Sequence, residues 1–429
     1  MSAGDRAAPA TTPPLFVIAV FTSAALVFMV QPMVAKLVLP MLGGSPAVWN
    51  TSMAFFQTAL LVGYGYAHFL QTISSVRRQI VVHIAALALA GLLLPLRISG
   101  LLGEPSSTMP ILWLLGVLTV SIGLPFAILS ATAPLVQAWH ARVVKGEGAK
   151  EPYALYAASN LGSLLALLAY PIAMEPLLTL QAQRLAWTGG YGLFVALLAA
   201  LALLVWRSSQ ATDRAGVEAA VSQTAAPSWR ERLVWVGLAA IPSSLMLGVT
   251  THLATDVASA PFLWVLPLAL YLATFIIAFQ SKPLISPYWG LLLQGAALPT
   301  CVFLLPQQGA ALWLQLLVHL SCFFLSALVC HQALVARRPD PAHLTVFYLC
   351  LSIGGVVGGA FNAVVAPQVF DWVAEYPLVL VLAGLARPWR WGRMSEWETG
   401  VFIAGLLATL GAAAMDDVVR DFLTFDRFT

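Results

Sequence analysis

The sequence has little charge. Only 9% of its 429 residues are Asp, Glu, Lys or Arg, whereas soluble globular proteins carry about 25%. Hydrophobic residues make up 60% of the chain, and apolar runs of about 20 residues, the length that crosses a bilayer, recur throughout. A soluble protein of this length has no use for such runs. We therefore predict an integral membrane protein that has the lipid bilayer as a partner and binds no nucleic acid.

Cysteine is scarce as well. The four cysteines, Cys301, Cys322, Cys330 and Cys350, all fall in apolar runs, and none forms a Cys-x-x-Cys pair. Cysteines in such surroundings usually act as small packing residues. We expect neither a disulfide nor a metal site from them.

Recognised catalytic motifs are missing from the sequence. It has no Gly-x-Ser-x-Gly, no His-Glu-x-x-His and no phosphate-binding Walker sequence. Its longest polar segment has about 25 residues, too few to bury a core of its own. We expect no cofactor, and the lack of these motifs favours a protein that is not an enzyme.

What the chain does have is a series of about 12 to 13 candidate transmembrane helices. The twelfth is short and is open to a re-entrant interpretation. The predicted spans are 15–41, 48–70, 79–98, 109–139, 153–173, 184–206, 233–253, 260–279, 287–306, 310–335, 343–366, 376–388 and 399–415.

The second half of the chain repeats features of the first half in the same order. The early series is Phe126–Ala131, His140, Arg142, Tyr156, Asn160–Ser163 and Tyr170-Pro171, and the late series is Phe324–Ala327, His331, Arg337-Arg338, Tyr348, Ser352–Gly355, Asn362 and Pro367. A weaker echo relates Ser45–Trp49 to Ser259–Trp264. Duplicated helical bundles with a site between the halves are typical of secondary transporters.

The distribution of basic residues predicts the orientation. With a cytoplasmic N-terminus, about 15 Lys and Arg fall in inside loops and about 2 in outside loops, as the positive-inside rule requires. We predict a multi-pass protein of the inner (plasma) membrane. Its predicted parts are a disordered tail (1–14), a first six-helix repeat (15–207), a cytoplasmic linker (208–230), a second six-helix repeat (231–388), and an extra helix with a C-terminal tail (389–429). The predicted fold is an all-α, major-facilitator-like bundle with two parallel repeats.

The glycine-rich segment Gly354–Gly359 resembles a nucleotide-binding loop only superficially. It lies in a membrane span without a preceding strand, and it contains two overlapping Gly-x-x-x-Gly pairs. Such pairs allow two helices to approach closely. We interpret the segment, and Gly162 at the corresponding place in the first half, as helix-packing sites.

Ionisable residues at membrane depth are costly and often functional. Lys36 lies near the outer end of the first span, where it either snorkels to the interface or binds a partner. His252 and Asp256 lie four residues apart at the outer end of the seventh span, on one helical face if the helix continues. Spans 1 and 7 are equivalent in the two repeats, so we predict that Lys36 pairs with Asp256 across a central cleft.

Further polar residues lie within the spans and complete the predicted binding set. For Gln57, Asn160 and Asn362, a hydrogen bond between helices is the favoured alternative to binding. The same interpretation covers Tyr156, Tyr348 and His331, whereas His68, His83 and His319 are treated as structural. The predicted binding residues are Gln31, Lys36, Asn50, Gln57, Asn160, His252, Asp256 and Asn362.

Several stretches resemble the membrane domain of bacterial spermidine-synthase-like membrane proteins. They are Gln31–Asn50, Phe56-Gln57, Gly63-Tyr64, Cys330-His331, Arg337–Pro339, His343–Tyr348, Gly354-Gly355 with Asn362, and Glu375–Pro377. The resemblance covers most of residues 15–388. It implies a major-facilitator-like membrane domain that relatives often carry fused to an aminopropyltransferase-like domain. No stretch after residue 415 supplies that second domain, so we expect no aminopropyl transfer from this chain.

Three functions remain after this reading. The first is a transporter-like bundle that moves a small polar or amphiphilic solute. The second is a membrane scaffold or partner for a separate, soluble aminopropyltransferase-like enzyme, and the third is an intramembrane enzyme using Lys36, His252 and Asp256. A polyamine substrate would need paired carboxylates in the low-dielectric interior, and the sequence offers few. An anionic or zwitterionic solute is at least as compatible.

Overall fold

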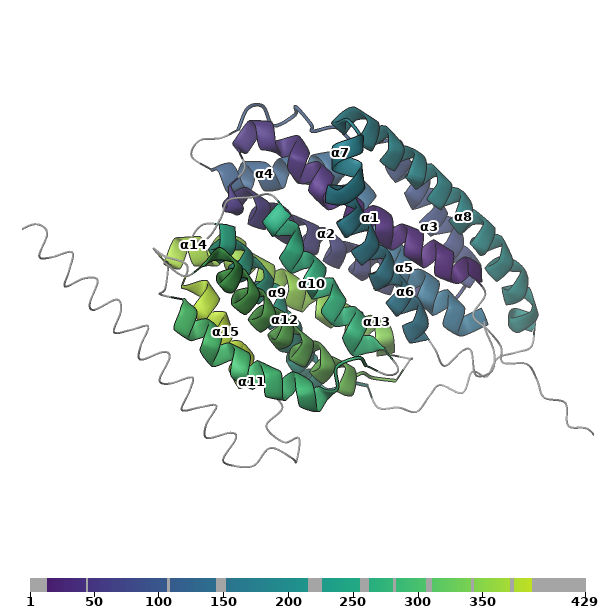
Figure 1. Ribbon diagram of the computed structural model, residues 1–429. Helices are drawn as coiled ribbons and strands as arrows, with labels where there is room; N and C mark the ends of the chain where they lie inside the picture. Colours follow the sequence, from purple (N-terminus) through teal and green to yellow (C-terminus); the bar gives the residue numbers. More distant parts are fainter. Residues whose placement is uncertain are drawn as a thin grey trace, which may run out of the picture. The chain divides into compact units, whose positions relative to one another are not determined.

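The described part of the chain is helical. The computed structural model describes residues 14–43, 45–105, 109–143, 152–214, 226–254, 262–280, 283–305, 311–340, 343–370 and 374–387. Figure 1 shows these residues as long helices joined by short connections. The predicted thirteenth span, 399–415, lies outside the described residues.

Six helical segments precede the predicted linker. They are α1 (Pro14–Leu42), α2 (Pro46–Gln71), α3 (Val76–Gly91), α4 (Pro110–Leu118) continuing into α5 (Leu124–Val143), α6 (Pro152–Ala169) continuing into α7 (Glu175–Leu177), and α8 (Leu180–Arg214). Helix α8 runs past the predicted end of its span at residue 206, so the residues that we assigned to the start of the linker are helical.

Six more segments follow the linker. They are α9 (Trp229–His252), α10 (Phe262–Phe279), α11 (Pro287–Leu304), α12 (Leu312–Ala336), α13 (Leu344–Ala360) continuing into α14 (Ala366–Val369), and α15 (Glu375–Leu385). The predicted domain boundaries stay a prediction.

Local sequence explains where two of these helices begin. The Ser45 hydroxyl accepts a hydrogen bond from the Val48 backbone N–H at 3.4 Å, and Pro46 opens α2. The Ser286 hydroxyl accepts one from the Trp289 N–H, also at 3.4 Å, and Pro287 opens α11. A serine cap satisfies one of the free N–H groups of the first turn, and proline at the first helical position has no N–H to satisfy.

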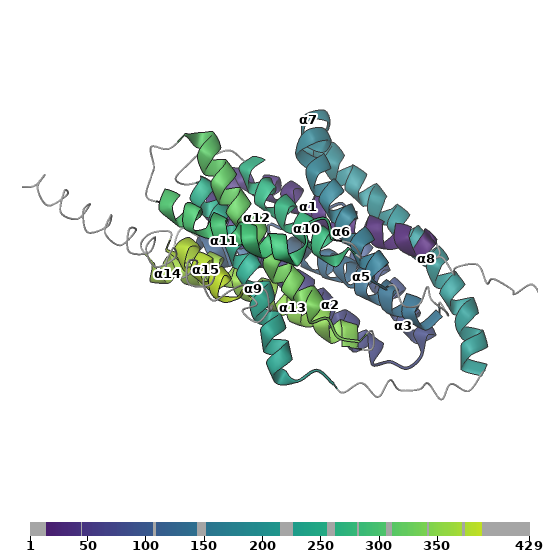
Figure 2. The same ribbon diagram turned by 60° about the horizontal axis from the view of Figure 1, so that its bottom comes forward.

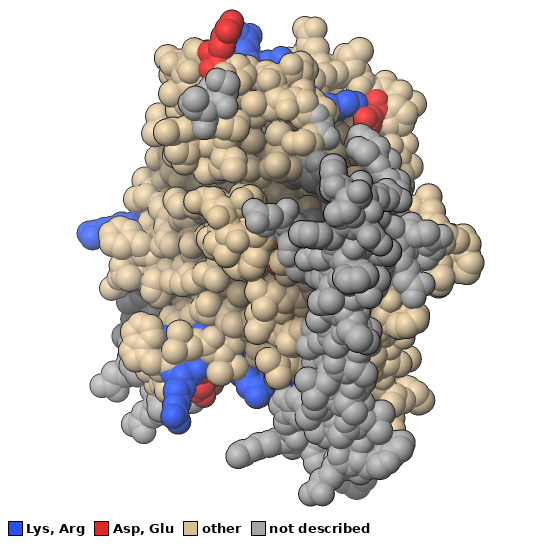
Figure 3. Space-filling view, turned by 90° about the vertical axis from the view of Figure 1, so that its left-hand side faces the viewer, with Lys and Arg blue, Asp and Glu red and all other residues tan. Residues whose placement is uncertain are grey.

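The helices have the composition of membrane spans. Within the described residues, eight helices are long and apolar enough to cross a bilayer, and two shorter apolar helices, Trp264–Phe279 and Glu375–Leu385, accompany them. On the face drawn in Figure 3, most charged side chains lie toward two opposite ends, and the middle is largely uncharged. An apolar band between charged ends is what a lipid-facing surface requires.

The helices group into two compact units. The first unit contains residues up to 236 together with 338–356, and the second contains 237–337 together with the residues from 357 onward. In the first unit, α1 packs along α6 and α2 packs along α5 (Figure 2). Gly162 allows α6 to approach α1 closely, because a Cβ there would lie 2.6 Å from the Phe21 carbonyl oxygen of α1.

The second unit repeats this packing. Gly358 of α13 lies against α9, where an added Cβ would meet the Ala240 carbonyl oxygen at 2.4 Å. Helices α10 and α11 both pack against α12, as α2 and α3 pack against α5 in the first unit. In each unit, therefore, the fifth segment contacts the first through a glycine, which confirms the predicted packing role of Gly162 and, within the Gly354–Gly359 segment, of Gly358.

The two fifth segments share one more irregularity. Helix α6 passes into α7 through the π-helical turn Tyr170–Met174, and α13 passes into α14 through the π-helical turn Phe361–Val365. Such turns are rare and are frequent at functional sites. Their presence at corresponding places supports the internal repeat that the sequence indicates.

Candidate functional site

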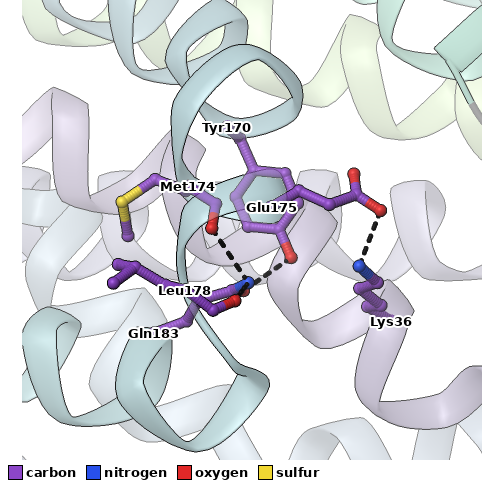
Figure 4. Close-up of polar contacts among 6 residues, drawn as sticks. All are labelled: Lys36, Tyr170, Met174, Glu175, Leu178 and Gln183. Carbon is purple, nitrogen blue, oxygen red and sulfur yellow. Dashed lines mark hydrogen bonds and ion pairs between the residues drawn. The ribbon is translucent and has the colours of Figure 1, made fainter.

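Polar side chains gather in three places: at the end of α1, in the interior of the first unit, and in the interior of the second unit. At the first place, the Lys36 Nζ of α1 lies 2.6 Å from the Glu175 Oε1 of α7. Figure 4 shows the two side chains reaching toward each other from neighbouring helices. Their side chains are 37% and 42% exposed, and an ion pair with that exposure contributes about 0.2–1 kcal/mol.

A hydrogen-bond network fixes the backbone that carries Glu175. The Tyr170 hydroxyl donates to the Gln183 Oε1 at 2.9 Å, and the Gln183 Nε2 donates to the carbonyl oxygens of Met174 at 3.3 Å and Leu178 at 2.9 Å (Figure 4). These bonds satisfy carbonyls at the end of the π-helical turn, where the regular helical bonds stop. The network therefore positions Glu175 opposite Lys36.

The structure thus gives Lys36 a partner that the sequence did not single out. Sequence reasoning looked for a counter-charge on the equivalent span and proposed Asp256, which lies outside the described residues, so that pairing stays a prediction. The partner in the described residues comes from the fifth segment of the same repeat. The signal in the sequence was a glutamate four residues after Pro171, but nothing in the sequence fixes which helix packs beside α1.

The predicted amides of the first unit lie in three helices. Gln31 in α1, Asn50 in α2 and Asn160 in α6 are buried, and Gln57 in α2 is half-buried. The Gln31 Oε1 and the Asn160 Nδ2 have no hydrogen-bond partner among the described residues. A buried polar atom without a partner costs about 1–3 kcal/mol. In a membrane protein such atoms are natural contacts for a polar solute.

Asn362, the predicted site residue of the second unit, binds its neighbouring helix. Its Nδ2 donates to the Ser244 hydroxyl of α9 and to the Gly358 carbonyl at 3.1 Å. The sequence analysis gave a hydrogen bond between helices as the alternative to solute binding, and the bond to Ser244 is such a bond. Its Oδ1 has no hydrogen-bond partner in the described chain, so a solute-binding role stays a prediction.

His252, the other predicted residue of the second unit, belongs to a larger group that we call the His319 cluster. The cluster brings together five side chains from four helices, and all five are at most 6% exposed. Its members are His252 of α9, Cys301 of α11, His319 and Cys322 of α12, and Tyr376 of α15.

His319 is the centre of this cluster. Its Nδ1 lies 3.0 Å from the Tyr376 hydroxyl and 3.2 Å from the Cys301 Sγ, and those two groups are themselves 3.4 Å apart. The His252 ring packs edge-on to the His319 ring at 4.5 Å and is stacked with the Tyr376 ring at 5.3 Å between centroids. Cys301 and Cys322 are free thiols that are hydrogen-bonded to each other. Among the described residues, no three His, Cys, Asp or Glu side chains are arranged to hold a metal ion.

Sequence reasoning missed most of this cluster. It treated His319 as structural and the cysteines as packing residues, because each stands alone in its span and no motif links them. The one signal was Tyr376, which lies in a stretch that carries the family resemblance. The remaining members come from helices that only the tertiary structure brings together.

His331 makes the predicted hydrogen-bonding contact between helices, and Tyr156 and Tyr348 meet through their rings. His331 is fully buried, and its Nδ1 lies 2.9 Å from the Thr274 hydroxyl of α10. In the first unit, the Tyr156 ring of α6 is stacked with the Tyr348 ring of α13 at 5.2 Å, with 14° between the planes.

Comparisons with known proteins identify the fold. No family model matches the sequence, and no curated protein matches it. Solved structures do match: the inward-open xylose transporter XylE from E. coli has a TM-score of 0.53 at 13% identity, over 87% of this chain and 94% of that one. Its partially occluded inward-open form has a TM-score of 0.52 at 14% identity, over 90% and 100%. The same transporter with bound 6-bromo-6-deoxy-D-glucose, described as a proton:xylose symporter of the major facilitator superfamily, has a TM-score of 0.51. The predicted fold class is confirmed: the chain is an all-α, multi-pass membrane protein with the fold of major facilitator transporters.

Proposed function

We propose that this protein is a membrane transporter that moves a small polar or amphiphilic solute. The observation that carries the proposal is the likeness to XylE, which extends over nearly the full length of a known transporter. The repeated helix packing and the apolar spans support it, because transporters of this kind are built from two helical repeats.

Buried polar atoms indicate the chemistry of the solute. The unpartnered atoms of Gln31 and Asn160 belong to neutral amides, which bind hydroxyl, carbonyl or carboxylate groups without demanding a charge. A polycation would need closely spaced carboxylates in the interior. We therefore favour a neutral, zwitterionic or anionic solute over a polyamine.

The cellular setting is part of the same proposal. The excess of Lys and Arg in alternate loops supports a plasma-membrane protein with a cytoplasmic N-terminus. A cysteine introduced in the 208–230 linker should then react with a membrane-impermeant thiol reagent only after the cells are opened. Reaction in intact cells would reverse the orientation.

We also propose that the chain is related to the spermidine-synthase-like membrane proteins that its sequence resembles. The stretches that carry it include Lys36 and Tyr376, and both make polar contacts with side chains of other helices. Their engagement in the bundle supports a function within the membrane. Docking of a separate soluble enzyme would instead place the shared residues on the surface outside the bilayer.

Solute uptake by the purified chain in lipid vesicles tests the proposed function. We would offer labelled solutes of four classes: neutral sugars, zwitterionic amino acids, carboxylates and polyamines. The proposal expects saturable uptake of at least one of the first three classes, compared with vesicles that hold no protein. Uptake of none of the four classes, by protein shown to be folded, would contradict transport.

A further inference from the structure

We propose that Cys301 and Cys322 are an oxidation site: a small hydroperoxide converts the two thiols into a disulfide that joins α11 to α12. This modification is separate from the movement of any solute. Its chemistry rests on contacts within the second unit, and its exposure to oxidants rests on the proposed orientation of the chain.

The two thiols are in direct contact. Both are free and fully buried, and they are hydrogen-bonded to each other. A disulfide requires the two sulfur atoms to close to about 2.05 Å, so the remaining approach is between atoms that already touch. The contact therefore revises, for oxidising conditions, the expectation from the sequence that these cysteines form no disulfide.

The packing of α11 against α12 fixes this contact. The Gln294 Nε2 of α11 donates to the Ser326 hydroxyl of α12 at 3.4 Å. Seven residues further along α11 is Cys301, and seven residues back along α12 is His319, whose Nδ1 lies 3.2 Å from the Cys301 Sγ. The two contacts define an antiparallel pair of helices, in which Cys322 follows His319 by one helical turn. A disulfide here would join helices that are already in register.

The position of the pair along the helices favours oxidation. Cys301 lies three residues before α11 ends at Leu304, and Cys322 lies in the half of α12 that begins at Leu312. In the proposed orientation, α11 and α12 are the ninth and tenth spans, and these ends face the outside of the cell. Disulfides form and persist on that side of the membrane, whereas the cytoplasm keeps thiols reduced.

The other two cysteines lack both features. Cys330 lies in the opposite half of α12, and Cys350 lies in the first half of α13. Both of these halves face the cytoplasm in the proposed orientation. Neither thiol is hydrogen-bonded to another cysteine among the described residues. They fit the role of buried packing residues and serve as internal controls for the pair.

The neighbours of Cys301 make it the sulfur that reacts first. Its Sγ lies 3.2 Å from the His319 Nδ1 and 3.4 Å from the Tyr376 hydroxyl. When the neutral imidazole carries its proton on Nε2, its Nδ1 accepts a hydrogen bond from the thiol. Such a bond increases the electron density on sulfur, as an adjacent base does for other nucleophiles. Cys322 then supplies the second thiol.

The oxidation is balanced as two steps. In the first, the Cys301 sulfur attacks a hydroperoxide, ROOH: the O–O bond breaks, an S–O bond forms, and the products are a sulfenic acid and the alcohol ROH. The sulfur gives two electrons to the peroxide, and the thiol proton goes to the leaving oxygen. In the second, the Cys322 sulfur displaces the sulfenic oxygen. The S–O bond breaks, the S–S bond forms, and the oxygen leaves as water with the Cys322 proton.

Burial selects the class of oxidant. Both thiols are shielded from solvent, so a protein disulfide or a charged peptide thiol cannot reach them. A small, uncharged hydroperoxide that dissolves in the bilayer can. The same shielding should protect the disulfide from large reductants once it has formed, because thiol–disulfide exchange depends on access to the sulfur.

Labelling of free thiols tests the proposal without any solute. The purified full chain in vesicles of saturated phosphatidylcholine is treated with tert-butyl hydroperoxide, unfolded in detergent and alkylated with N-ethylmaleimide. We expect the labels per chain to fall from four, one for each cysteine, to two, on Cys330 and Cys350. Mass spectrometry should find the Cys301 and Cys322 peptides joined and lighter by two hydrogen atoms.

Single variants test the order of the two steps. In Cys322→Ser the second step is blocked, so a sulfenic acid should accumulate at Cys301, where dimedone traps it. In Cys301→Ser, Cys322 should remain a free thiol. Cys330→Ser is the matched control and should form the disulfide to the same extent as wild type.

The wild-type experiment alone can overturn the proposal, so it does not depend on how a variant folds. Retention of all four labels, at a dose of peroxide that oxidises a free thiol dissolved in the same bilayer, would show that the pair is inert. Equal loss of label from all four cysteines would show that Cys301 and Cys322 are not special. Because no solute is present, either result leaves the proposed transport untouched, and a chain that moves no solute leaves this inference untouched.

Discussion

The two units use the same helix packing but place their polar groups differently. Each unit brings its fifth segment onto its first through a glycine, at Gly162 and at Gly358. The first unit contains a charged pair, Lys36 and Glu175, and both side chains are more than a third exposed. The second unit sets uncharged groups around His319 in its interior.

This comparison separates the features that hold the helices together from the features that serve a function. A repeated feature, such as a close-approach glycine, is needed twice because each unit must pack its own helices. A polar group present in only one unit is not required for this shared packing and is available for a separate function. The exposed pair of the first unit contributes little energy, whereas the buried groups of the second unit are costly to keep and so point to a function.

The largest effect should come from the shared packing. Gly162→Ala and Gly358→Ala each place a Cβ within 2.6 Å of a carbonyl oxygen on the facing helix, so the helices must separate. We expect each to destabilise its unit by about 1–3 kcal/mol, measured as a lower midpoint of thermal unfolding in detergent. Gly355→Ala in α13 is the control, since its Cβ would meet nothing within 4 Å. Equal midpoints for Gly355→Ala and Gly358→Ala would show that the glycine contact is not what joins these helices.

The two asparagines should separate stability from transport. Asn362→Leu removes the donor to Ser244 and leaves a buried hydroxyl without it, at a cost of about 1–3 kcal/mol. Asn160→Leu removes an amide nitrogen that has no partner among the described residues, so its thermal midpoint should change less while solute uptake falls. The comparison fails if Asn160→Leu unfolds as readily as Asn362→Leu, or if its uptake equals that of wild type.

The smallest effect should come from the exposed ion pair. A double-mutant cycle with Lys36→Ala and Glu175→Ala should give a coupling of about 0.2–1 kcal/mol that weakens at high salt. A second cycle with Asp256→Ala tests the pairing that the sequence suggested. Coupling to Asp256 larger than coupling to Glu175 would restore the sequence-based assignment.

The sequence predicted the scaffold better than the site. Hydropathy and repeated motifs located the spans, because a bilayer imposes length and apolarity on every helix that crosses it. Trp49 and Trp264, which correspond in the weaker echo, are indeed both buried near the start of their helices. The packing role of Gly162 was predictable for the same reason, since small residues at fixed spacing act locally.

The candidate site depended on contacts that spacing does not encode. Glu175 and Lys36 are 139 residues apart, and His319 and Tyr376 are 57 residues apart on different helices. A lone histidine or cysteine in an apolar span is most often a packing residue. Only the arrangement of α9, α11, α12 and α15 distinguishes His319 from the other buried histidines.

Solute uptake by matched variants in vesicles tests the central claim most directly. Vesicles that hold the protein are supplied with a solute that the wild-type chain moves, and the internal concentration is followed. We expect Lys36→Ala to take up the solute at a rate close to that of wild type, because the exposed ion pair contributes little energy. We expect His319→Gln to take it up more slowly, because His319 is at the centre of the buried polar cluster. Uptake by His319→Gln at the wild-type rate would contradict the division of roles between the two units.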